Sequence, residues 1–322
     1  MTPEEAEPKS SAVVVRRIRG SGLDLTVTDF GERDRPTVVL VHGFPDTRAV
    51  WEPVAQLLAA AGLHVVTYDV RGAGDSGVPR EQSDYALSVL IADMAAVVAD
   101  VSPGSPVHLV GHDWGSIQGW EAVTSELLGG RIASFTSISG PPLEHAALWA
   151  RGHRTRRLSD LRLALNQAAH SWYILLFHLP RLPEVVTTGL RARRGAAAAL
   201  RRWGLPSGEA PAGSTLGDDF AHGLELYRAN VRQRFRHPAA KFTDTPVQII
   251  VPMADRYVTP ALLDGLEKWS ALVWRRQSDA GHWIIRTHPD QVARWVGEVI
   301  AFVEDGSETD DLARSRLRHE SD

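Results

Sequence analysis

Short runs of β-branched residues alternate with alanine- and leucine-rich stretches through the first 140 residues of this 322-residue chain. Residues 36–42 (PTVVLVH) form a continuous apolar run, which is typical of a strand buried on both faces. Similar patterns predict strands at 13–19, 23–30, 63–69, 107–111 and 132–139, and helices at 49–61, 85–100 and 114–128. This alternation predicts an α/β fold with a mostly parallel central sheet and helices on both faces.

The alternation stops after residues 140–142 (GPP) and resumes only at a predicted strand over 247–252. A last strand is expected at 271–277, and a closing helix at 289–304. This pattern predicts an α/β core over 1–140 and 246–304, a helical insertion over 141–245, and a polar tail or linker over 305–322.

Composition excludes several classes of function. The chain has no cysteine, so disulfide scaffolds, thiolate catalysis and cysteine-ligated zinc are excluded. The net charge is only -4, which gives no overall basic field for nucleic acid. No apolar run approaches the roughly 20 residues of a membrane span, and the acidic start, MTPEEAEPKS, is unlike a secretory signal. We expect a cytoplasmic protein.

Residues 111–115 (GHDWG) lie between a predicted strand and a predicted helix, the context in which G-x-S-x-G forms a nucleophile elbow. The central residue here is Asp113, which predicts a carboxylate nucleophile. Asp255 follows the strand at 247–252, and His282 follows the last strand, so nucleophile, acid and histidine occur in the order of a hydrolase triad. Residues that follow adjacent parallel strands meet at one edge of the sheet.

Residues 42–45 (HGFP) end the first buried strand, beside the expected position of the elbow. His42 and Pro45 frame the turn, and Pro45 is expected to follow a cis peptide bond. The backbone N–H groups of Phe44 and Trp114 would be the two donors of an oxyanion hole.

Taken together, the motifs at 42–45, 69–76 (DVRGAGDS), 111–115 and 281–283 (GHW), with the Asp255 loop, resemble the α/β-hydrolase-fold epoxide hydrolases over residues 15–304. The resemblance implies that the insertion is a cap carrying two tyrosines that hydrogen-bond the epoxide oxygen. Tyr173 (in SWYILLFHLP) and Tyr227 (in ELYRANV) lie in segments similar to those of the two family tyrosines.

The resemblance also implies a reaction. Asp113 would attack an oxirane carbon to form an ester, and His282, oriented by Asp255, would activate water to release a vicinal diol. Water is then the only co-substrate, and neither a metal nor an organic cofactor is expected.

Two other functions compete with this interpretation. Haloalkane dehalogenases share the aspartate nucleophile and the following tryptophan, but a departing halide needs N–H donors, whereas an epoxide oxygen needs a proton or a strong hydrogen bond. The two phenols suit the epoxide, and Phe44 stands where dehalogenases often have asparagine. The third function is a non-catalytic ligand-binding homologue, a class that usually lacks a triad member or the cap tyrosines.

A weaker resemblance is to the N-terminal part of actinobacterial fusion proteins that join such a hydrolase to a short-chain dehydrogenase. The basic residues fit an actinobacterial source, since only Lys9, Lys241 and Lys268 are lysines among 35 lysines and arginines. The chain contains no G-x-x-x-G-x-G dinucleotide loop, so a dehydrogenase domain would lie beyond residue 322.

Eleven arginines occur between Arg151 and Arg202, against only Asp160 and Glu184. This charge predicts either a solvated cap surface or a face that docks on an anionic lipid surface or an acidic partner. Membrane association would suit a hydrophobic, lipid-derived epoxide as substrate.

Overall fold

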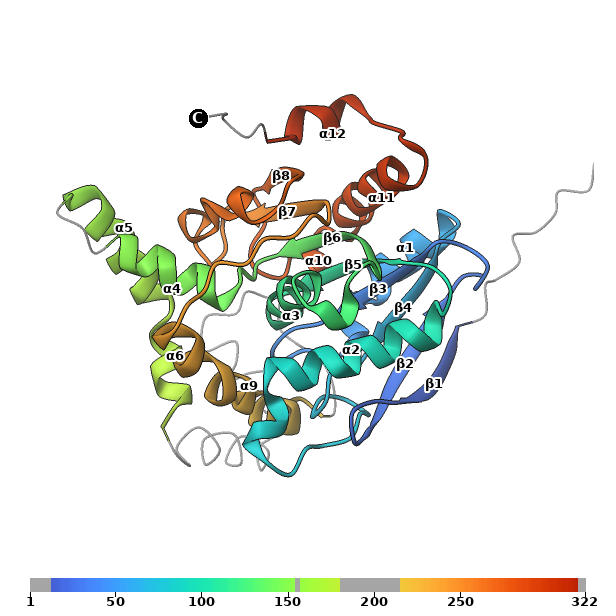
Figure 1. Cartoon of the computed structure of the whole chain (residues 1–322), viewed down its shortest axis with the longest axis horizontal. Helices are drawn as coiled ribbons and strands as arrows, with labels where there is room; N and C mark the ends of the chain where they lie inside the picture. The colour runs from blue at the N-terminus through green and yellow to red at the C-terminus, as the bar shows by residue number, and fades with distance from the viewer. Residues whose placement is uncertain (1–12, 154–156, 180–214, 318–322) are drawn as a thin grey trace, which may run out of the picture.

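The computed structural model describes residues 13–153, 157–179 and 215–317 (Figure 1). Its sheet has the strand order β1-β2-β4-β3-β5-β6-β7-β8. The strands are β1 (Val14–Arg19), β2 (Asp24–Phe30), β3 (Thr37–Val41), β4 (His64–Tyr68), β5 (Val107–His112), β6 (Ile132–Ile138), β7 (Val247–Pro252) and β8 (Val273–Ser278). The β1–β2 and β2–β4 pairs are antiparallel and all the others are parallel, which confirms the predicted α/β fold.

The helices of the described residues include those on both faces of this sheet, those of the insertion between β6 and β7, and one at the sheet edge. They are α1 (Glu52–Ala60), α2 (Leu87–Val101), α3 (Trp114–Val123), α4 (Leu143–Gly152), α5 (Leu158–His170), α6 (Trp172–Phe177), α9 (Leu216–Arg236), α10 (Ile284–Thr287), α11 (Pro289–Asp305) and α12 (Asp310–Ser315). Short 3₁₀ turns lie at Arg48–Trp51, Gln82–Tyr85, Glu126–Leu128, Pro260–Leu263 and Leu266–Trp269. Within the described ranges, no helix is both long enough and apolar enough to cross a membrane.

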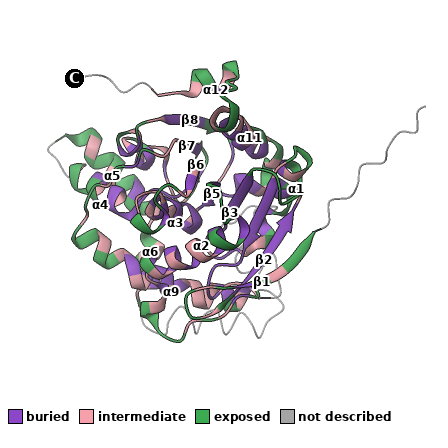
Figure 2. Cartoon of the chain, turned by 45° about the vertical axis from the view of Figure 1, so that its right-hand side comes forward, coloured by how far each residue is buried: buried purple, intermediate pink, exposed green. Residues whose placement is uncertain are grey.

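The core forms two layers because successive strand residues point to opposite faces. On β3, Val39 and Val41 belong to the apolar cluster that includes side chains of α2 and α3. Val38 and Leu40 belong to the cluster that includes side chains of α1 and α11. All residues of β3 are buried, which explains the unbroken apolar run. Figure 2 shows the central strands β3 and β5 as buried.

Two predicted helices have different limits in the structure. The helix expected at 49–61 begins with a 3₁₀ turn, and its α-helical part starts at Glu52 with Pro53 in the first turn, where proline's missing N–H costs nothing. The helix expected at 114–128 ends at Val123, because the Thr124 hydroxyl donates to the Trp120 carbonyl (3.0 Å) and Ser125 Oγ accepts from the Leu127 N–H (3.2 Å).

Between β6 and β7 lie the helices α4, α5, α6 and α9, which we call the cap (Figure 1). The long helix α9 is joined to the core by polar contacts: Asp219 Oδ1 accepts from the Gly74 N–H (2.8 Å), and Asn230 Oδ1 accepts from the Leu87 N–H (2.8 Å). Most of the arginine-rich stretch, including residues 181–202, lies outside the described residues.

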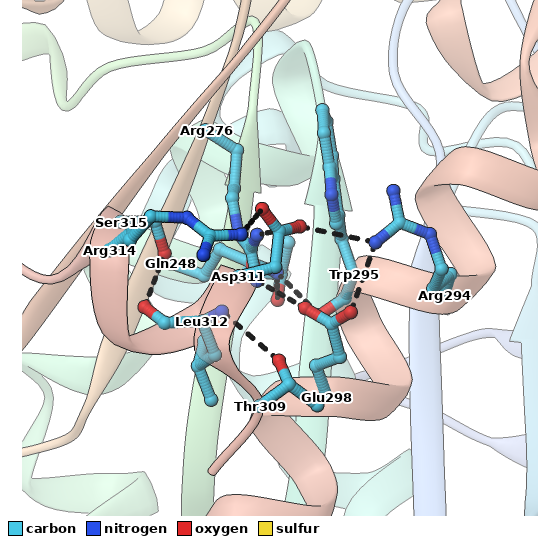
Figure 3. A network of polar contacts seen from close by, with 11 residues as sticks. Gln248, Arg276, Arg294, Trp295, Glu298, Thr309, Asp311, Leu312, Arg314 and Ser315 are labelled. Atoms are coloured by element: carbon cyan, nitrogen blue, oxygen red, sulfur yellow. Dashed lines mark hydrogen bonds and ion pairs between the residues drawn. The ribbon is translucent and has the colours of Figure 1, made fainter.

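The prediction of a polar tail from residue 305 is wrong for residues up to 317. Helix α12 packs against the sheet edge, with Leu312 fully buried beside Trp274 of β8. Arg276 pairs with Asp311 (2.6 Å) and with Glu298 of α11, as Figure 3 shows. The polar sequence of this segment resembles a linker, but its Asp311 forms an ion pair with the core and its Leu312 packs into the core.

Candidate active site

Asp113 lies at the turn between β5 and α3, where the backbone adopts φ 53° and ψ -120°. A positive φ is strained for a residue with a Cβ and raises its side chain above the strand end. The turn is possible because its neighbours are glycines. A Cβ on Gly111 would collide with the Gly115 carbonyl, and a Cβ on Gly115 would collide with the Val41 carbonyl. In the GHDWG motif the two glycines are therefore required by the backbone of the turn, and the aspartate supplies the carboxylate.

The loop after β3 supplies a hydrogen-bond donor to this carboxylate. The Phe44 N–H donates to Asp113 Oδ1 (2.7 Å), and the Trp114 N–H is a second backbone donor. The Phe44–Pro45 peptide bond is cis, as predicted. His42 fixes the loop from below, since its Nε2 accepts from the Val70 N–H (2.9 Å) and its Nδ1–H donates to the Gly43 carbonyl (2.9 Å). Two backbone N–H groups thus donate to the Asp113 carboxylate.

His282 and Asp255 lie on the other side of the carboxylate. The His282 Nδ1–H donates to Asp255 Oδ2 (2.8 Å), and its Nε2 is 3.6 Å from Asp113 Oδ2. Asp255 is held by the N–H groups of Tyr257 (2.8 Å) and Val258 (3.0 Å), which donate to its other oxygen. The structure therefore brings the three predicted triad residues together, with the imidazole between the two carboxylates.

Burial and charge shift the pKa values of Asp113 and His282. Burial raises the pKa of Asp113 to about 6, although His282 and the two N–H donors act against the shift. Burial alone would lower the pKa of His282, but the charge and hydrogen bond of Asp255, with a further contribution from Asp113, raise it to about 9. Between these values the free site holds an Asp113 carboxylate beside a protonated His282.

The two predicted cap tyrosines meet above Asp113. Tyr173 on α6 and Tyr227 on α9 are hydrogen-bonded to each other, and the Trp114 indole N–H donates to Tyr227. Burial, together with the Asp113 carboxylate, raises the pKa of both phenols above the ordinary value, so they keep their protons. Two neutral O–H donors therefore face the cavity that contains the carboxylate.

Two cavities adjoin Asp113, Tyr173 and Tyr227. The first has a volume of about 420 Å³ and is also lined by His282, Phe220 and Trp283. The second has a volume of about 450 Å³ and extends beneath α5 between mostly apolar side chains, including Ile117, Trp149 and Leu262. The reactive carboxylate thus lies where two apolar spaces meet, a setting typical of a small-molecule site.

Comparison with known proteins agrees with this geometry. The sequence profile described as the alpha/beta hydrolase fold matches residues 36–289. The chain is an α/β hydrolase. The match includes the oxyanion loop, the elbow, the cap and the triad histidine, so the family covers every part of the site.

Curated relatives of this α/β hydrolase include the "Probable oxidoreductase EphD" of Mycobacterium tuberculosis, which is 37% identical over 295 residues. That alignment covers 89% of this chain and 49% of the relative, so the chain spans about half the length of this relative. "Epoxide hydrolase A" of the same organism is 32% identical over 178 residues, covering 55% of this chain and 52% of the relative.

Solved structures with the same fold include the epoxide hydrolase VrEH1 from Vigna radiata, with a TM-score of 0.67 and 21% identity over 89% of this chain and 97% of the other. An epoxide hydrolase from Bacillus megaterium gives a TM-score of 0.69 at 21% identity, over 88% of this chain and 99% of the other. At this identity the two structures establish the fold of this α/β hydrolase and no more.

Sequence reasoning missed three residues that support the site. Tyr257 stacks edge-on against His282 (ring centroids 4.9 Å apart) and Tyr173 (5.6 Å). Gln167 of α5 accepts from the Thr259 N–H (3.0 Å) and so joins the cap to the loop of the triad acid. Asp46 accepts from the Trp283 indole (2.7 Å) and joins the oxyanion loop to the histidine loop. Only Tyr257 carried a signal, because it lies two residues after Asp255.

No metal centre is visible in the part of the chain that the structure describes: no three histidine, aspartate or glutamate side chains there are arranged to hold an ion. The chemistry of the described site is that of carboxylates, imidazole, phenols and backbone N–H groups.

Proposed function

We propose that this α/β hydrolase converts a hydrophobic epoxide and water to a vicinal diol through a covalent ester on Asp113. The observation that carries the proposal is the pair of neutral, hydrogen-bonded phenols, Tyr173 and Tyr227, that shares its cavity with the Asp113 carboxylate. The names of the curated epoxide hydrolase relatives support the same reaction class.

In the first step, Asp113 Oδ2 attacks one oxirane carbon, and the bond between that carbon and the ring oxygen breaks. The departing alkoxide is held by the two phenols and takes a proton from one of them. Because Asp113 becomes a neutral ester, His282 loses one of the negative charges that raise its pKa. Alkylation therefore lets the imidazolium release its proton, which returns through solvent to the phenolate. The neutral imidazole that remains can act as a base.

In the second step, His282 Nε2 removes a proton from water, and the resulting hydroxide attacks the carboxyl carbon of Asp113. The negative charge on the tetrahedral intermediate develops on Oδ1, the oxygen that already accepts the Phe44 N–H (2.7 Å). Asp255 stabilises the imidazolium that forms. As the intermediate collapses, its hydroxyl proton passes to the leaving alkoxide. The diol is released, and the carboxylate and imidazolium of the free site are restored.

The environment of Trp114 argues against the dehalogenase alternative. A halide site would need its indole N–H as a donor to the leaving ion, but here that N–H donates to Tyr227. The non-catalytic alternative has little support in this geometry, because the triad and both tyrosines are present at interacting distances.

The tyrosines give a direct test of the leaving group. The double variant Tyr173→Phe with Tyr227→Phe should lose about 10²–10⁴-fold of epoxide turnover, which is the contribution of general acid assistance. Each single variant should lose less, because one phenol remains. Initial rates on matched panels of epoxides and haloalkanes measure this. A double variant near the wild-type rate on epoxides, or turnover of haloalkanes by the wild type, would favour the dehalogenase.

The raised pKa of Asp113 predicts the pH dependence of the first step. The pKa is about 6, above the ordinary value of 3.8, so protonation at lower pH removes the nucleophile. The single-turnover rate of ester formation should fall about tenfold per pH unit below pH 6 and level off above pH 7. Stopped-flow tryptophan fluorescence between pH 5 and 8 would record it. An alkylation rate that does not change between pH 5 and 7 would be incompatible with this nucleophile.

We infer that the substrate is lipid-derived, because both cavities are largely apolar. A short-chain dehydrogenase beyond residue 322 stays a prediction, which the sequence of the full gene would check.

A further inference from the structure

Large apolar side chains are exposed on the outer surface of the cap. They lie on the two consecutive helices α5 and α6, at the end of the molecule farthest from β1 (Figure 1), and Figure 2 shows α5 largely exposed. The exposed fractions are 75% for Leu158, 43% for Leu161, 61% for Leu165, 56% for Trp172 and 77% for Leu175. We call these five residues the cap patch. A cluster of this kind on a soluble domain usually marks an interaction surface.

The spacing within α5 separates two faces. Leu158, Leu161 and Leu165 follow an i, i+3, i+7 pattern and therefore share one face. The opposite face is already used: Gln167 is buried against the Thr259 loop, and Ala164 lines the second cavity. Leu158, Leu161 and Leu165 are thus not needed for packing the cap onto the core, and their apolar surface is directed outward.

Positive charge accompanies the patch. Arg162 lies one turn after Leu158 on the same face, and Arg157 precedes the helix; both are exposed. Residues 151–162 carry five arginines against one acid, Asp160. A surface that inserts into the headgroup region of an anionic bilayer typically combines leucine and tryptophan with arginine. A second copy of the chain fits less well, because a two-fold contact through the patch would bring the arginines of both copies together.

The patch is continuous with the substrate cavities. Trp172 lines both of them, and Leu175 lines the second, although both side chains are more than half exposed. The cap patch and the substrate cavities therefore share the side chains of Trp172 and Leu175.

We propose that the cap patch docks on an anionic lipid bilayer. The five apolar side chains of the patch would lie in the headgroup region, and Arg157 and Arg162 would contact lipid phosphates. This goes beyond the proposed function and does not depend on it, since docking can be measured without an epoxide. If both proposals hold, the cavity opens toward the phase in which a lipid epoxide is dissolved.

The test is co-sedimentation of the 322-residue chain with vesicles of phosphatidylcholine alone or with about 30% phosphatidylglycerol, in low and moderate salt. We expect binding to the anionic vesicles that weakens as salt rises. The triple variant Leu158→Gln, Leu161→Gln, Leu165→Gln should bind at least about tenfold more weakly, because it loses the apolar anchor. None of the three residues lines a described cavity.

The matched control removes three exposed apolar side chains elsewhere: Leu57→Gln, Val78→Gln and Leu127→Gln, which are 37%, 52% and 58% exposed. This control should bind as the wild type does. Thermal unfolding checks that both triple variants fold, and Arg157→Gln with Arg162→Gln supplies a second variant that leaves the leucines in place and should also bind more weakly.

Three outcomes would overturn the proposal. They are no binding by the wild type, equal binding to neutral and anionic vesicles, and equal loss of binding in the patch and control variants. A wild-type dimer in size-exclusion chromatography that the patch variant converts to a monomer would assign the surface to a second copy instead.

Discussion

Replacing Asp113 with alanine is expected to abolish diol formation, with kcat/KM at least about 10⁴-fold below the wild-type value. Alanine cannot form the ester, and among the described residues Asp255 is no substitute, since it is hydrogen-bonded to His282 and to the N–H groups of its own loop. Removing the strained carboxylate should not unfold the domain. Initial rates with a racemic epoxide, followed by chromatography of the diol, measure the loss.

The matched control is Asp264→Ala, which removes a largely exposed carboxylate that pairs with Arg275 outside the cavities. Its activity should stay close to that of the wild type. Diol formation by the Asp113→Ala variant above about one-hundredth of the wild-type rate would exclude Asp113 as the nucleophile.

His282→Gln is expected to separate the two chemical steps. Ring opening needs Asp113 and the phenols and should continue, whereas hydrolysis needs a base that glutamine cannot provide. The ester should therefore accumulate, and the intact protein should gain a mass equal to that of the substrate. Mass spectrometry after incubation with an epoxide that the wild type turns over would detect it.

The control for this result is the double variant Asp113→Ala with His282→Gln, which should gain no mass because the acceptor carboxylate is absent. An unmodified His282→Gln protein, or equal modification of the double variant, would contradict the assigned roles. The first result would remove His282 from the second step, and the second would place the adduct on another residue.

The fold could be predicted from sequence because its determinants are local or periodic. The buried run of β3 indicates a strand covered on both faces, and the glycines beside Asp113 indicate a turn that other residues could not adopt. The order of Asp113, Asp255 and His282 along the chain indicates a shared edge, since each follows a strand of a parallel sheet.

The remaining features depend on contacts between distant segments. Gln167 and Asp46 have ordinary sequence contexts, and their roles appear only when the cap and two loops are packed around the triad. Helix α12 was missed for a related reason. Its polar sequence resembles a linker until Arg276 and Leu312 are seen in the pairing and packing that hold it against β8.

Hydrogen bonding of the Trp114 indole also lies beyond sequence reasoning, and it bears on which leaving group the site accepts. The GHDWG motif is shared by enzymes of both chemistries, so the residue type does not separate them. The hydrogen-bond partner of the indole does separate them. Because the indole N–H donates to Tyr227, the side-chain donors left for a leaving group beside the carboxylate are the two phenols. A phenol can give up its proton to an alkoxide, which is the requirement of ring opening.

The central claim is that the diol receives its new oxygen from Asp113, and a single turnover in ¹⁸O-labelled water tests it most directly. With enzyme in excess over epoxide, the oxygen transferred to the substrate should be one that Asp113 held before mixing, so the first diol should be almost free of label. The label should instead appear in the Asp113 carboxylate, and in diol formed by later turnovers. A first diol that carries one full equivalent of ¹⁸O would mean direct attack by water and would contradict the covalent mechanism.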